Sequence, residues 1–355
     1  MTRAQWEAIT STVKGTNKCV AAAAIIDSPW IPGYCGCSFL DFYCRPDIWF
    51  EDYKKVHNDF PTVSFLPDWW VEYGMAAEPS GFGARIRFSD DNMPTVYPVI
   101  DSQDKIGEIT ASLPDPDPRA DGLMPLILNM QRMHMPRIEE IGEIVPMVCA
   151  RGPFTIASHL LPMTDLLISV MEEPEVVLKL LRKTTRLVIR WLQAQLESVR
   201  TAEAVMVLDD VCGFLDADTF LRTAFPLFRE IFDAFPGMIH MFHNDTPRDS
   251  CYPFLDAMGV DIFNFSHGID IGSVRRAVGE RVVLMGNVPP MSLSRLTPEE
   301  VYSESKRILH RYCDVNGGPG GLLLSVGGGV PMGAKGENLR AVIRAADEFN
   351  AKLLP

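Results

Sequence analysis

The stretch Gly237–Pro247 reads Gly-Met-Ile-His-Met-Phe-His-Asn-Asp-Thr-Pro, and the interpretation of the whole chain starts from it. Its apolar part, Met238–Phe242, stops abruptly at His243, Asn244 and Asp245. Such a run is typical of a buried parallel strand that presents polar groups at its carboxyl tip. In a parallel α/β barrel that tip faces the active site. We therefore predict that His243 and Asp245 belong to a functional site.

Three further apolar runs end in the same way. Ala204–Leu208 is followed by Asp209 and Asp210, Asp261–Phe265 by Ser266 and His267, and Arg281–Met285 by Gly286 and Asn287. Core packing alone does not explain four apolar runs that each end in a polar pair. The candidate catalytic residues are therefore His243, Asp210, His267 and Asp245. One member of the Asp209–Asp210 pair is expected to bond to backbone, and Asp210, nearer the tip, is the functional candidate.

Strand-like and helix-like segments alternate from residue 144 onward. The expected strands are 144–150, 204–208, 238–242, 261–265, 281–285 and 320–326, and long helices are expected at 175–198, 218–235, 298–312 and 338–352. This spacing favours an α/β fold of the (β/α)8 TIM barrel type over an open doubly wound sheet. The glycine fingerprint of dinucleotide-binding sheets is absent, because Gly317–Gly321 precedes an expected strand instead of following one.

The first 120 residues are less regular, and we interpret them as an N-terminal extension of the same barrel. Helices are expected at 2–14 and 46–59, and strands at 20–26, 62–66 and 84–88. The segment 93–118, rich in proline and aspartate, is expected to hold no regular element. A helix over 122–141 is expected to break at Pro136. We predict a single domain over 1–355, with excursions in 1–120 and regular repeats in 144–355.

Composition limits the classes of partner. The chain has 355 residues, of which 47% are hydrophobic and 22% charged, enough for one barrel-sized domain. Its net charge of −13 argues against nucleic acid and against an anionic membrane surface. No apolar run approaches about 20 residues, and the start of the chain lacks the apolar core of a signal peptide. Eight cysteines are not disulfide-dense, so we expect a cytoplasmic protein.

Aromatic side chains gather in the two segments that follow the first two expected strands. Asp27–Tyr34 is a proline-containing loop, and Asp68–Tyr73 holds two adjacent tryptophans beside two carboxylates. One interpretation is a hydrophobic plug or subunit contact, and the other is a stacking wall for an aromatic ligand. The second interpretation predicts as substrate-binding residues Trp30, Tyr34, Trp69, Trp70, Tyr73 and Phe82.

The segment Arg151–Leu160 reads Arg-Gly-Pro-Phe-Thr-Ile-Ala-Ser-His-Leu. It resembles the Gly-Pro-Phe-Thr-(Leu/Ile)-Ala-Ser segment of the uroporphyrinogen decarboxylase superfamily. Further similarities follow in order at 209–210, 240–245, 286–288, 324–331 and 337–339. The resemblance extends from about residue 20 to the end and implies a (β/α)8 barrel. It also implies one of two chemistries, tetrapyrrole decarboxylation or methyl transfer with cobalamin proteins.

The branches of this superfamily differ in their motifs. The decarboxylases have paired arginines in an N-terminal segment, and the equivalent loop 27–34 has none. The thiol-methylating branch binds zinc through a His-x-Cys motif and a later cysteine. Aligning His240 with the motif histidine puts Phe242 at the first cysteine and Gly328 at the second. The segments 27–33, 69–74 and 242–246 are instead similar to methyltransferases that demethylate methoxylated aromatics.

This last resemblance implies that the methyl group passes to the cobalamin of a separate corrinoid protein. Two versions of the activation stay open. In one, zinc or a similar divalent ion held by His243, Asp210 and His267 polarises the ether oxygen. In the other, no metal takes part, and His243 or His267 protonates the leaving oxygen. His159 and Asn287 are further candidates for substrate contacts, with packing or turn formation as the alternative.

Several alternatives remain at this stage. Within the fold, the methyl donor could be a methylamine, a methyl thiol or methanol, or the protein could be a uroporphyrinogen-decarboxylase-like enzyme. A barrel that binds a partner without catalysis is the alternative from another class. A homodimer agrees with the resemblance, and the sequence does not decide it. His240 points away from His243 by strand alternation and is expected to be structural.

Overall fold

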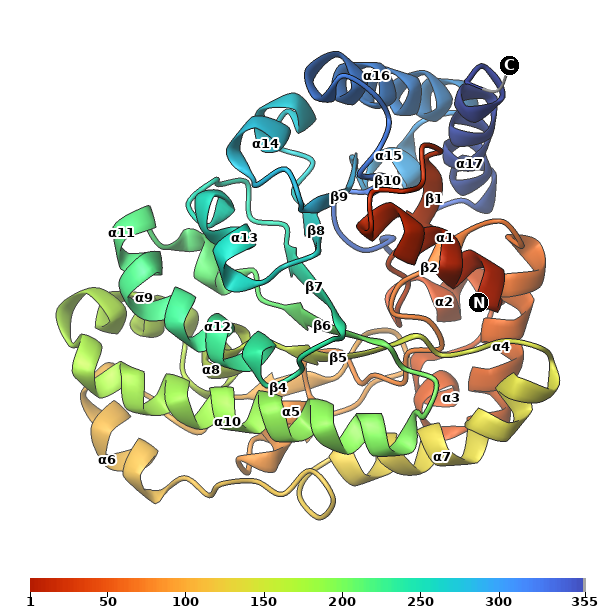
Figure 1. The fold of residues 1–355 in the computed structure, drawn as a ribbon. Coiled ribbons are helices and arrows are strands. Elements are labelled where there is room, and N and C mark those ends of the chain that lie inside the picture. The colour runs from red at the N-terminus through yellow and green to blue at the C-terminus, as the bar shows by residue number, and fades with distance from the viewer. Residues whose placement is uncertain (354–355) are drawn as a thin grey trace.

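Eight parallel strands form the centre of the computed structural model, which describes residues 1–353 (Figure 1). Their order across the sheet is β2-β1-β10-β9-β8-β7-β6-β5. This is the order of a (β/α)8 barrel, in which strands that follow one another in the chain are adjacent in the wall. The strands are β1 (Ala21–Ala24), β2 (Ser64–Phe65), β5 (Met147–Arg151), β6 (Ala204–Leu208), β7 (Ile239–Asn244), β8 (Ile262–Phe265), β9 (Val283–Val288) and β10 (Leu322–Val326). The predicted TIM barrel is confirmed.

The strands are apolar throughout because both of their faces are buried. In β6, for example, all five residues are buried. Ala204, Met206 and Leu208 belong to the apolar cluster inside the barrel, whereas Val205 and Val207 pack against the outer layer. This alternation of inward and outward residues fixes which side chains at a strand end point into the barrel.

Helices surround the strands (Figure 1). The longer ones are α4 (Pro46–Asp59), α7 (Met124–Glu140), α9 (Met163–Glu172), α10 (Pro174–Ser198), α16 (Pro298–Asn316) and α17 (Gly336–Ala351). The shorter ones include α2 (Ile31–Cys35), α3 (Phe39–Cys44), α5 (Ala77–Gly81), α8 (Pro153–Leu160), α12 (Phe225–Asp233), α13 (Leu255–Met258), α14 (Ile271–Ala277) and α15 (Ser292–Arg295). Within residues 1–353 no single helix has the length and apolar character to span a membrane, although α8 and α9, bent by 115°, pass that test together.

Helix α1 (Arg3–Val13) closes the amino end of the barrel. Its Trp6 and Ile9 join the apolar cluster inside the barrel. The indole nitrogen of Trp6 donates to Glu203, directly before β6, at 2.9 Å. The chain therefore places its first helix beneath the strands, at the end opposite their carboxyl tips.

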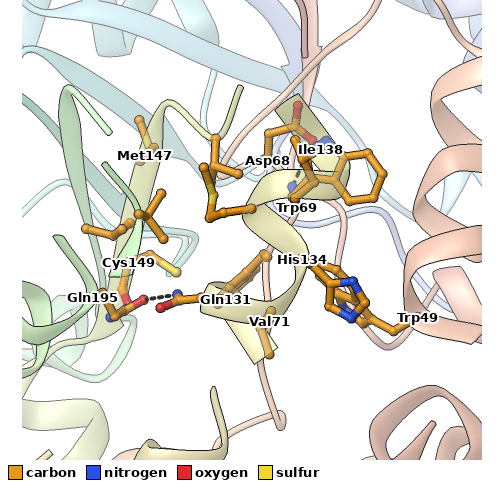
Figure 2. Close-up of a pocket in the computed structure, with 15 residues that line it drawn as sticks. Trp49, Asp68, Trp69, Val71, Gln131, His134, Ile138, Met147, Cys149 and Gln195 are labelled. Atoms are coloured by element: carbon orange, nitrogen blue, oxygen red, sulfur yellow. Dashed lines mark hydrogen bonds between the residues drawn. The ribbon is translucent and has the colours of Figure 1, made fainter. Parts of the chain in front are cut away.

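The hydrogen-bonded ladder does not connect β2 with β5, the two edges of the strand order. Side chains close the ring there, because Leu66 and Trp70 pack with Met147 and Cys149 in the interior cluster. Gln195 of α10 donates to the Cys149 carbonyl at 2.8 Å, a bond that a neighbouring strand would otherwise make. Figure 2 shows Gln131 of α7 meeting Gln195 beside β5. We call this junction, residues 66–70 against 147–149, the seam.

Two expectations for the N-terminal part are wrong. Helix α7 continues through Pro136, because the buried side chains of Met135 and Ile138 hold both sides of it against the core and offset the lost N–H bond. The segment 93–118 contains β4 (Thr95–Tyr97) and α6 (Ile106–Ser112). The first of these pairs antiparallel with β3 (Arg85–Arg87), so the expected strand 84–88 exists but lies outside the barrel.

Candidate functional site

Asp210, His243 and Asp245 gather at the carboxyl ends of β6 and β7. Strand alternation explains their direction, since Leu208 and Met241 lie inside the barrel and Asp210 and His243 follow two residues later. One side-chain ligand atom from each of the three lies within 4.8 Å of the other two. The Nε2 atom of His243 is 3.4 Å from Asp210 Oδ1, which also accepts the backbone N–H of Asp245 at 2.9 Å.

Asn264 of β8 sets the orientation of His243. Its Oδ1 lies 2.7 Å from His243 Nδ1, and its Nδ2 donates to the carbonyls of Met285 at 2.8 Å and Val326 at 3.1 Å. The two carbonyls fix the amide, so Oδ1 must accept and His243 Nδ1 must hold the proton. Nε2 is thereby left facing Asp210 with a free lone pair in the neutral ring. A metal-binding histidine is commonly supported in this way.

The electrostatics of the cluster also fit a cation. Burial and the negative charge of Asp210 raise the pKa of Asp245, while His243 and His267 lower it to a smaller extent. A divalent ion would relieve this repulsion between carboxylates. One imidazole and two carboxylates suit zinc or a harder ion, and three protein ligands leave a position open for a substrate oxygen.

His267 lies near the cluster but outside the group with metal-ligand spacing. His267 is exposed in the turn after β8. The backbone of this turn lies close to Gly327, on which a Cβ would come to 2.5 Å from the backbone nitrogen of His267. The structure therefore does not bring together the predicted metal set of His243, Asp210 and His267. Asp245, predicted as catalytic, occupies the third position because it continues the inward alternation of β7.

The glycines after β10 press against the loops of this carboxyl face. A side chain on Gly328 would lie 2.9 Å from Asp245 Oδ2, and one on Gly329 would lie 3.7 Å from Asp27 Oδ2. Gly328 also has a φ of +131°, which residues with a Cβ rarely adopt. Without side chains, Gly328 and Gly329 allow the segment after β10 to approach both carboxylates closely. Asp245 and Asp27 therefore lie next to consecutive residues of this segment.

His240 and Phe242 do not reach the carboxyl face. Both ring nitrogens of His240 lie 2.9 Å from backbone carbonyls near the start of β7, which confirms its structural role. Phe242 packs edge-on against Phe228 in the outer layer. The two residues that this alignment sets against the His-x-Cys motif therefore lie outside the site. His243 and Asp245 have the same spacing and do reach the site.

Asp209 is the member of the acidic pair that bonds to backbone, as expected. It is fully buried and accepts the Phe154 N–H at 2.8 Å and the Thr155 hydroxyl at 3.1 Å, at the start of α8. Burial raises its pKa to about 7, against the lowering effect of these hydrogen bonds. Asp209 therefore supports α8 from below, while Asp210 faces the site.

Five of the six predicted aromatic wall residues pack in the outer layer: Trp30, Tyr34, Trp69, Tyr73 and Phe82. Trp30, for example, is 1% exposed and donates to the Ala334 carbonyl at 2.9 Å. Trp69 stacks on Phe50 at 5.1 Å between ring centroids. This packing agrees with the plug interpretation for Trp69 and Tyr73, whose rings lie against Phe50 of α4 and Tyr43 of α3. A substrate contact of the other rings stays a prediction. Trp70 alone of the six joins the interior cluster.

The two further substrate-contact candidates differ in outcome. Asn287 donates to the carbonyls of Ser266 at 3.2 Å and Ile269 at 2.8 Å, so its amide holds the loop after β8. Burial and the charge of Arg151 lower the pKa of His159 to about 4, so its ring is neutral at physiological pH. A substrate contact of His159 stays a prediction.

Four residues of this face were missed from the sequence: Asp27, Glu72, Arg151 and Asn264. Asp27 follows β1, and Arg151 is the last residue of β5. Both continue the alternation of inward-facing residues in their strands, so the rule that predicted His243 applies to them too. Burial and the charge of Glu72 raise the pKa of Asp27 to about 8, partly offset by Arg151. Asn264 could have been found as a lone amide side chain within an otherwise apolar strand, all of which is buried.

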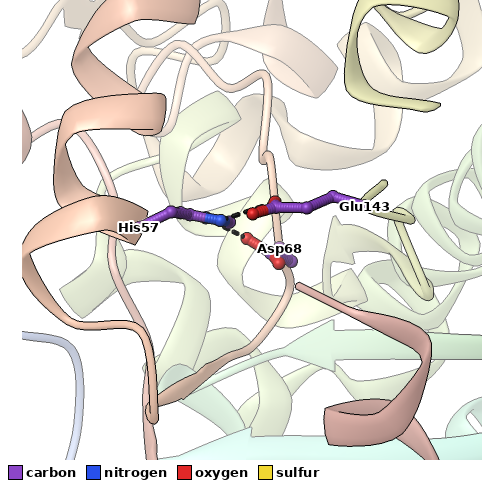
Figure 3. A group of neighbouring side chains, drawn as sticks. All are labelled: His57, Asp68 and Glu143. Carbon is purple, nitrogen blue, oxygen red and sulfur yellow. Dashed lines mark ion pairs between the residues drawn. The ribbon is translucent and has the colours of Figure 1, made fainter. Parts of the chain in front are cut away.

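A second group with ligand-like spacing lies at the seam and consists of His57, Asp68 and Glu143 (Figure 3). His57 Nε2 is 2.8 Å from Asp68 Oδ1, and its Nδ1 is 2.6 Å from Glu143 Oε2. The two ring nitrogens thus face different carboxylates, and the amino group of Met1 pairs with the same two, with Glu143 at 3.2 Å. The charges of the group are therefore paired within the protein. We interpret the group as a charged bridge, the His57 bridge, which joins the segment after β2 to the segment before β5.

Fold and site together place this protein among the (β/α)8-barrel enzymes, with polar groups at the carboxyl ends of the strands. Residues 36–349 match the family described as Uroporphyrinogen decarboxylase (URO-D). The match covers most of the chain, and the protein belongs to this family.

Relatives and a solved structure agree with that assignment. The uroporphyrinogen decarboxylase of Aromatoleum aromaticum is 24% identical over 348 residues, which covers 91% of this chain and 90% of the relative. That of Methylococcus capsulatus is 28% identical over 247 residues, covering 66% and 67%. A methyltransferase from Methanosarcina mazei superposes with a TM-score of 0.79 at 18% identity, over 98% of this chain and 99% of the other. At this identity the likeness shows a shared fold.

Proposed function

We propose that the protein moves a methyl group from a methoxylated aromatic compound to the cob(I)alamin of a separate corrinoid protein. The supporting observation is the group of Asp210, His243 and Asp245 at the carboxyl face. Its nitrogen and oxygen donors suit the activation of an oxygen-bound methyl group better than that of a thiol, which favours softer ligands. The fold shared with a methyltransferase is compatible with this reaction.

The chemical difficulty lies at the ether oxygen, because phenolate is a poor leaving group. A divalent ion held by Asp210, His243 and Asp245 would supply Lewis-acid stabilisation of the negative charge on that oxygen. Asn264 keeps Nε2 of His243 turned toward this position. In the version without metal, the protonated His243 donates its Nε2 proton to the leaving oxygen, and Asp210 stabilises the imidazolium.

The corrinoid protein has to approach the carboxyl face. The chain contains no Asp-x-His-x-x-Gly motif, so the cobalamin is assigned to the partner. Phe214, Met291 and Met332 follow β6, β9 and β10 and are 44%, 44% and 51% exposed. Exposed apolar side chains at a rim support a protein contact there, and methionine adapts well to a partner surface.

A methyl-transfer assay tests the proposal. Purified protein is mixed with cob(I)alamin and either methoxybenzoates, guaiacol, methylamines or methanol, the cobalamin spectrum is followed, and bound metal is quantified. Methylcobalamin is expected with the aryl ethers only. His243→Ala is expected to lower the rate by about 100-fold or more, and the exposed His310→Ala is the matched control. No transfer from any donor, repeated with a cognate corrinoid protein, would leave the non-catalytic barrel as the better interpretation.

A further inference from the structure

Arg151, at the end of β5, is a buried arginine without a carboxylate partner. It is 7% exposed, and its Nη2 donates to the Gly74 carbonyl at 3.2 Å. Within residues 1–353, no carboxylate oxygen lies within 4.0 Å of the guanidinium nitrogens. Its other side-chain N–H groups have no protein acceptor there and are not sealed from solvent. A guanidinium has five N–H donors, so most of them remain available to a ligand.

The position of Arg151 directs it toward the site. Met147 and Cys149 line the barrel interior, and Arg151 continues that alternation at the carboxyl end. Its Cζ lies 4.9 Å from the ring centroid of Trp70, the aromatic wall residue that does face the interior. A buried charge is unfavourable unless something pairs with it. No carboxylate oxygen of the described residues lies within ion-pair distance of this guanidinium, which points to a ligand.

The groups around Arg151 limit the charge of that ligand. Glu72 is occupied, because it accepts the backbone N–H groups of Ser28, at 2.9 Å, and Gly74. Asp27 is protonated at neutral pH, since burial and the charge of Glu72 raise its pKa to about 8. Asp27 can therefore donate a hydrogen bond. Glu78, also buried, accepts the backbone N–H of Arg151 at 2.9 Å. Because three carboxyl groups surround one cation, the position suits at most a monoanion, and a dianion such as phosphate would be repelled.

We propose that Arg151 binds a carboxylate of the methyl donor, so that the donor is a methoxylated acid. Its carboxylate would lie at Arg151 and its methoxy oxygen at Asp210, His243 and Asp245, so this inference rests on the proposed function of that cluster. Gly329 lies beside Asp27, and Gly328 lies beside Asp245. The Cα atoms of these two consecutive glycines are about 3.8 Å apart. The two subsites therefore border the same short segment. A planar guanidinium binds a carboxylate through two parallel hydrogen bonds, which a neutral donor cannot form.

Equilibrium binding tests the inference without any cobalamin. Calorimetry compares methoxybenzoate with its neutral amide, methoxybenzamide. The wild-type protein is expected to bind the acid roughly 10- to 100-fold more tightly than the amide. Arg151→Gln should lose this preference, and Arg151→Lys should keep part of it because the charge remains without the planar fork. Arg186→Gln, which changes an exposed arginine paired with Asp115, is the matched control.

Two results would overturn the inference: equal affinity of the wild-type protein for acid and amide, or a preference that survives in Arg151→Gln. The wild-type comparison and Arg151→Lys keep the test decisive if Arg151→Gln does not fold. Methoxyacetate bound as tightly as methoxybenzoate would support the carboxylate subsite and remove the aromatic ring from the proposed donor.

His243→Ala separates this inference from the proposed function. It should keep the preference for the acid while losing methyl transfer. Binding that depends on Arg151, with no transfer from any donor, would support the subsite and overturn the proposed function. Transfer from guaiacol as fast as from methoxybenzoate, unchanged in Arg151→Gln, would do the reverse.

Discussion

The barrel wall is held together in two different ways. From β5 through β10 to β1, neighbouring strands pair through backbone hydrogen bonds, over five residues between β6 and β7 and between β9 and β10. At the seam the closure depends on side chains, namely Gln195, the His57 bridge and the packing of Trp70. A backbone ladder tolerates changes of side chain, whereas a junction made by side chains needs each of them. His243 and Asn264 stand on the laddered arc, where the backbone fixes their positions.

Removing a charge from the His57 bridge is expected to have the largest effect on stability. Asp68 is fully buried, pairs with His57 and accepts the Trp69 N–H at 2.9 Å. Asp68→Ala removes one of the two carboxylates that face the buried imidazole and also leaves the buried amino group of Met1 without this partner, so the free energy of unfolding should fall by about 3–5 kcal/mol. Denaturant unfolding measures this. Asp115→Ala, which removes an exposed pair with Arg186, should change it far less. Similar losses in both variants would contradict a special role of the seam.

The second prediction concerns the pH dependence of the same bridge. Burial alone would lower the pKa of His57, but the charge of Asp68 and hydrogen bonds to Asp68 and Glu143 raise it above 6.5 overall. Burial would raise the pKa of Asp68 and Glu143, but His57 and the amino group of Met1 together lower both overall. The histidine contribution is therefore present below pH 6.5 and lost as pH rises through its folded pKa. The carboxylate contributions are present above their ordinary values of 3.8 and 4.5 and lost on acidification.

Comparison with His57→Gln isolates this effect from other titrating groups. The difference in unfolding free energy between wild type and variant should be largest between about pH 4.5 and 6.5 and should shrink toward alkaline pH. Thermal or denaturant unfolding across this range provides the measurement. A difference that stays constant with pH would show that His57 acts only by packing.

The smallest expected effect is the loss of one hydrogen bond at the seam. Gln195→Leu leaves the Cys149 carbonyl without its donor, so stability should fall by about 1–3 kcal/mol. Gln193→Leu changes an exposed position of the same helix and is the control. Methyl transfer at saturating donor should be nearly unaffected, since neither glutamine reaches the carboxyl face. An equal change in both variants would remove Gln195 from the closure of the barrel.

The sequence predicted the laddered arc well because the responsible pattern is local. Each strand there is a short apolar run, and the polar residues that follow it, such as His243 and Asp245, share its inward phase. The directions of the tryptophans could not be predicted, since hydrophobicity indicates that Trp69 and Trp70 are buried without telling which faces the interior. The seam also escaped prediction. His57, Asp68 and Glu143 are far apart in the chain, and no local pattern marks three residues that meet only after folding.

The docking of α1 has a consequence for the order of events during synthesis. Trp6 bonds to Glu203, which lies 197 positions later in the chain. Helix α1 leaves the ribosome long before Glu203, so this part of its docking surface is missing until the chain up to β6 has emerged. Contacts of such long range form late, since the chain between them must first be ordered. The helix at the amino end of the barrel is thus made before the strands that it covers, and its docking is completed only after they have formed.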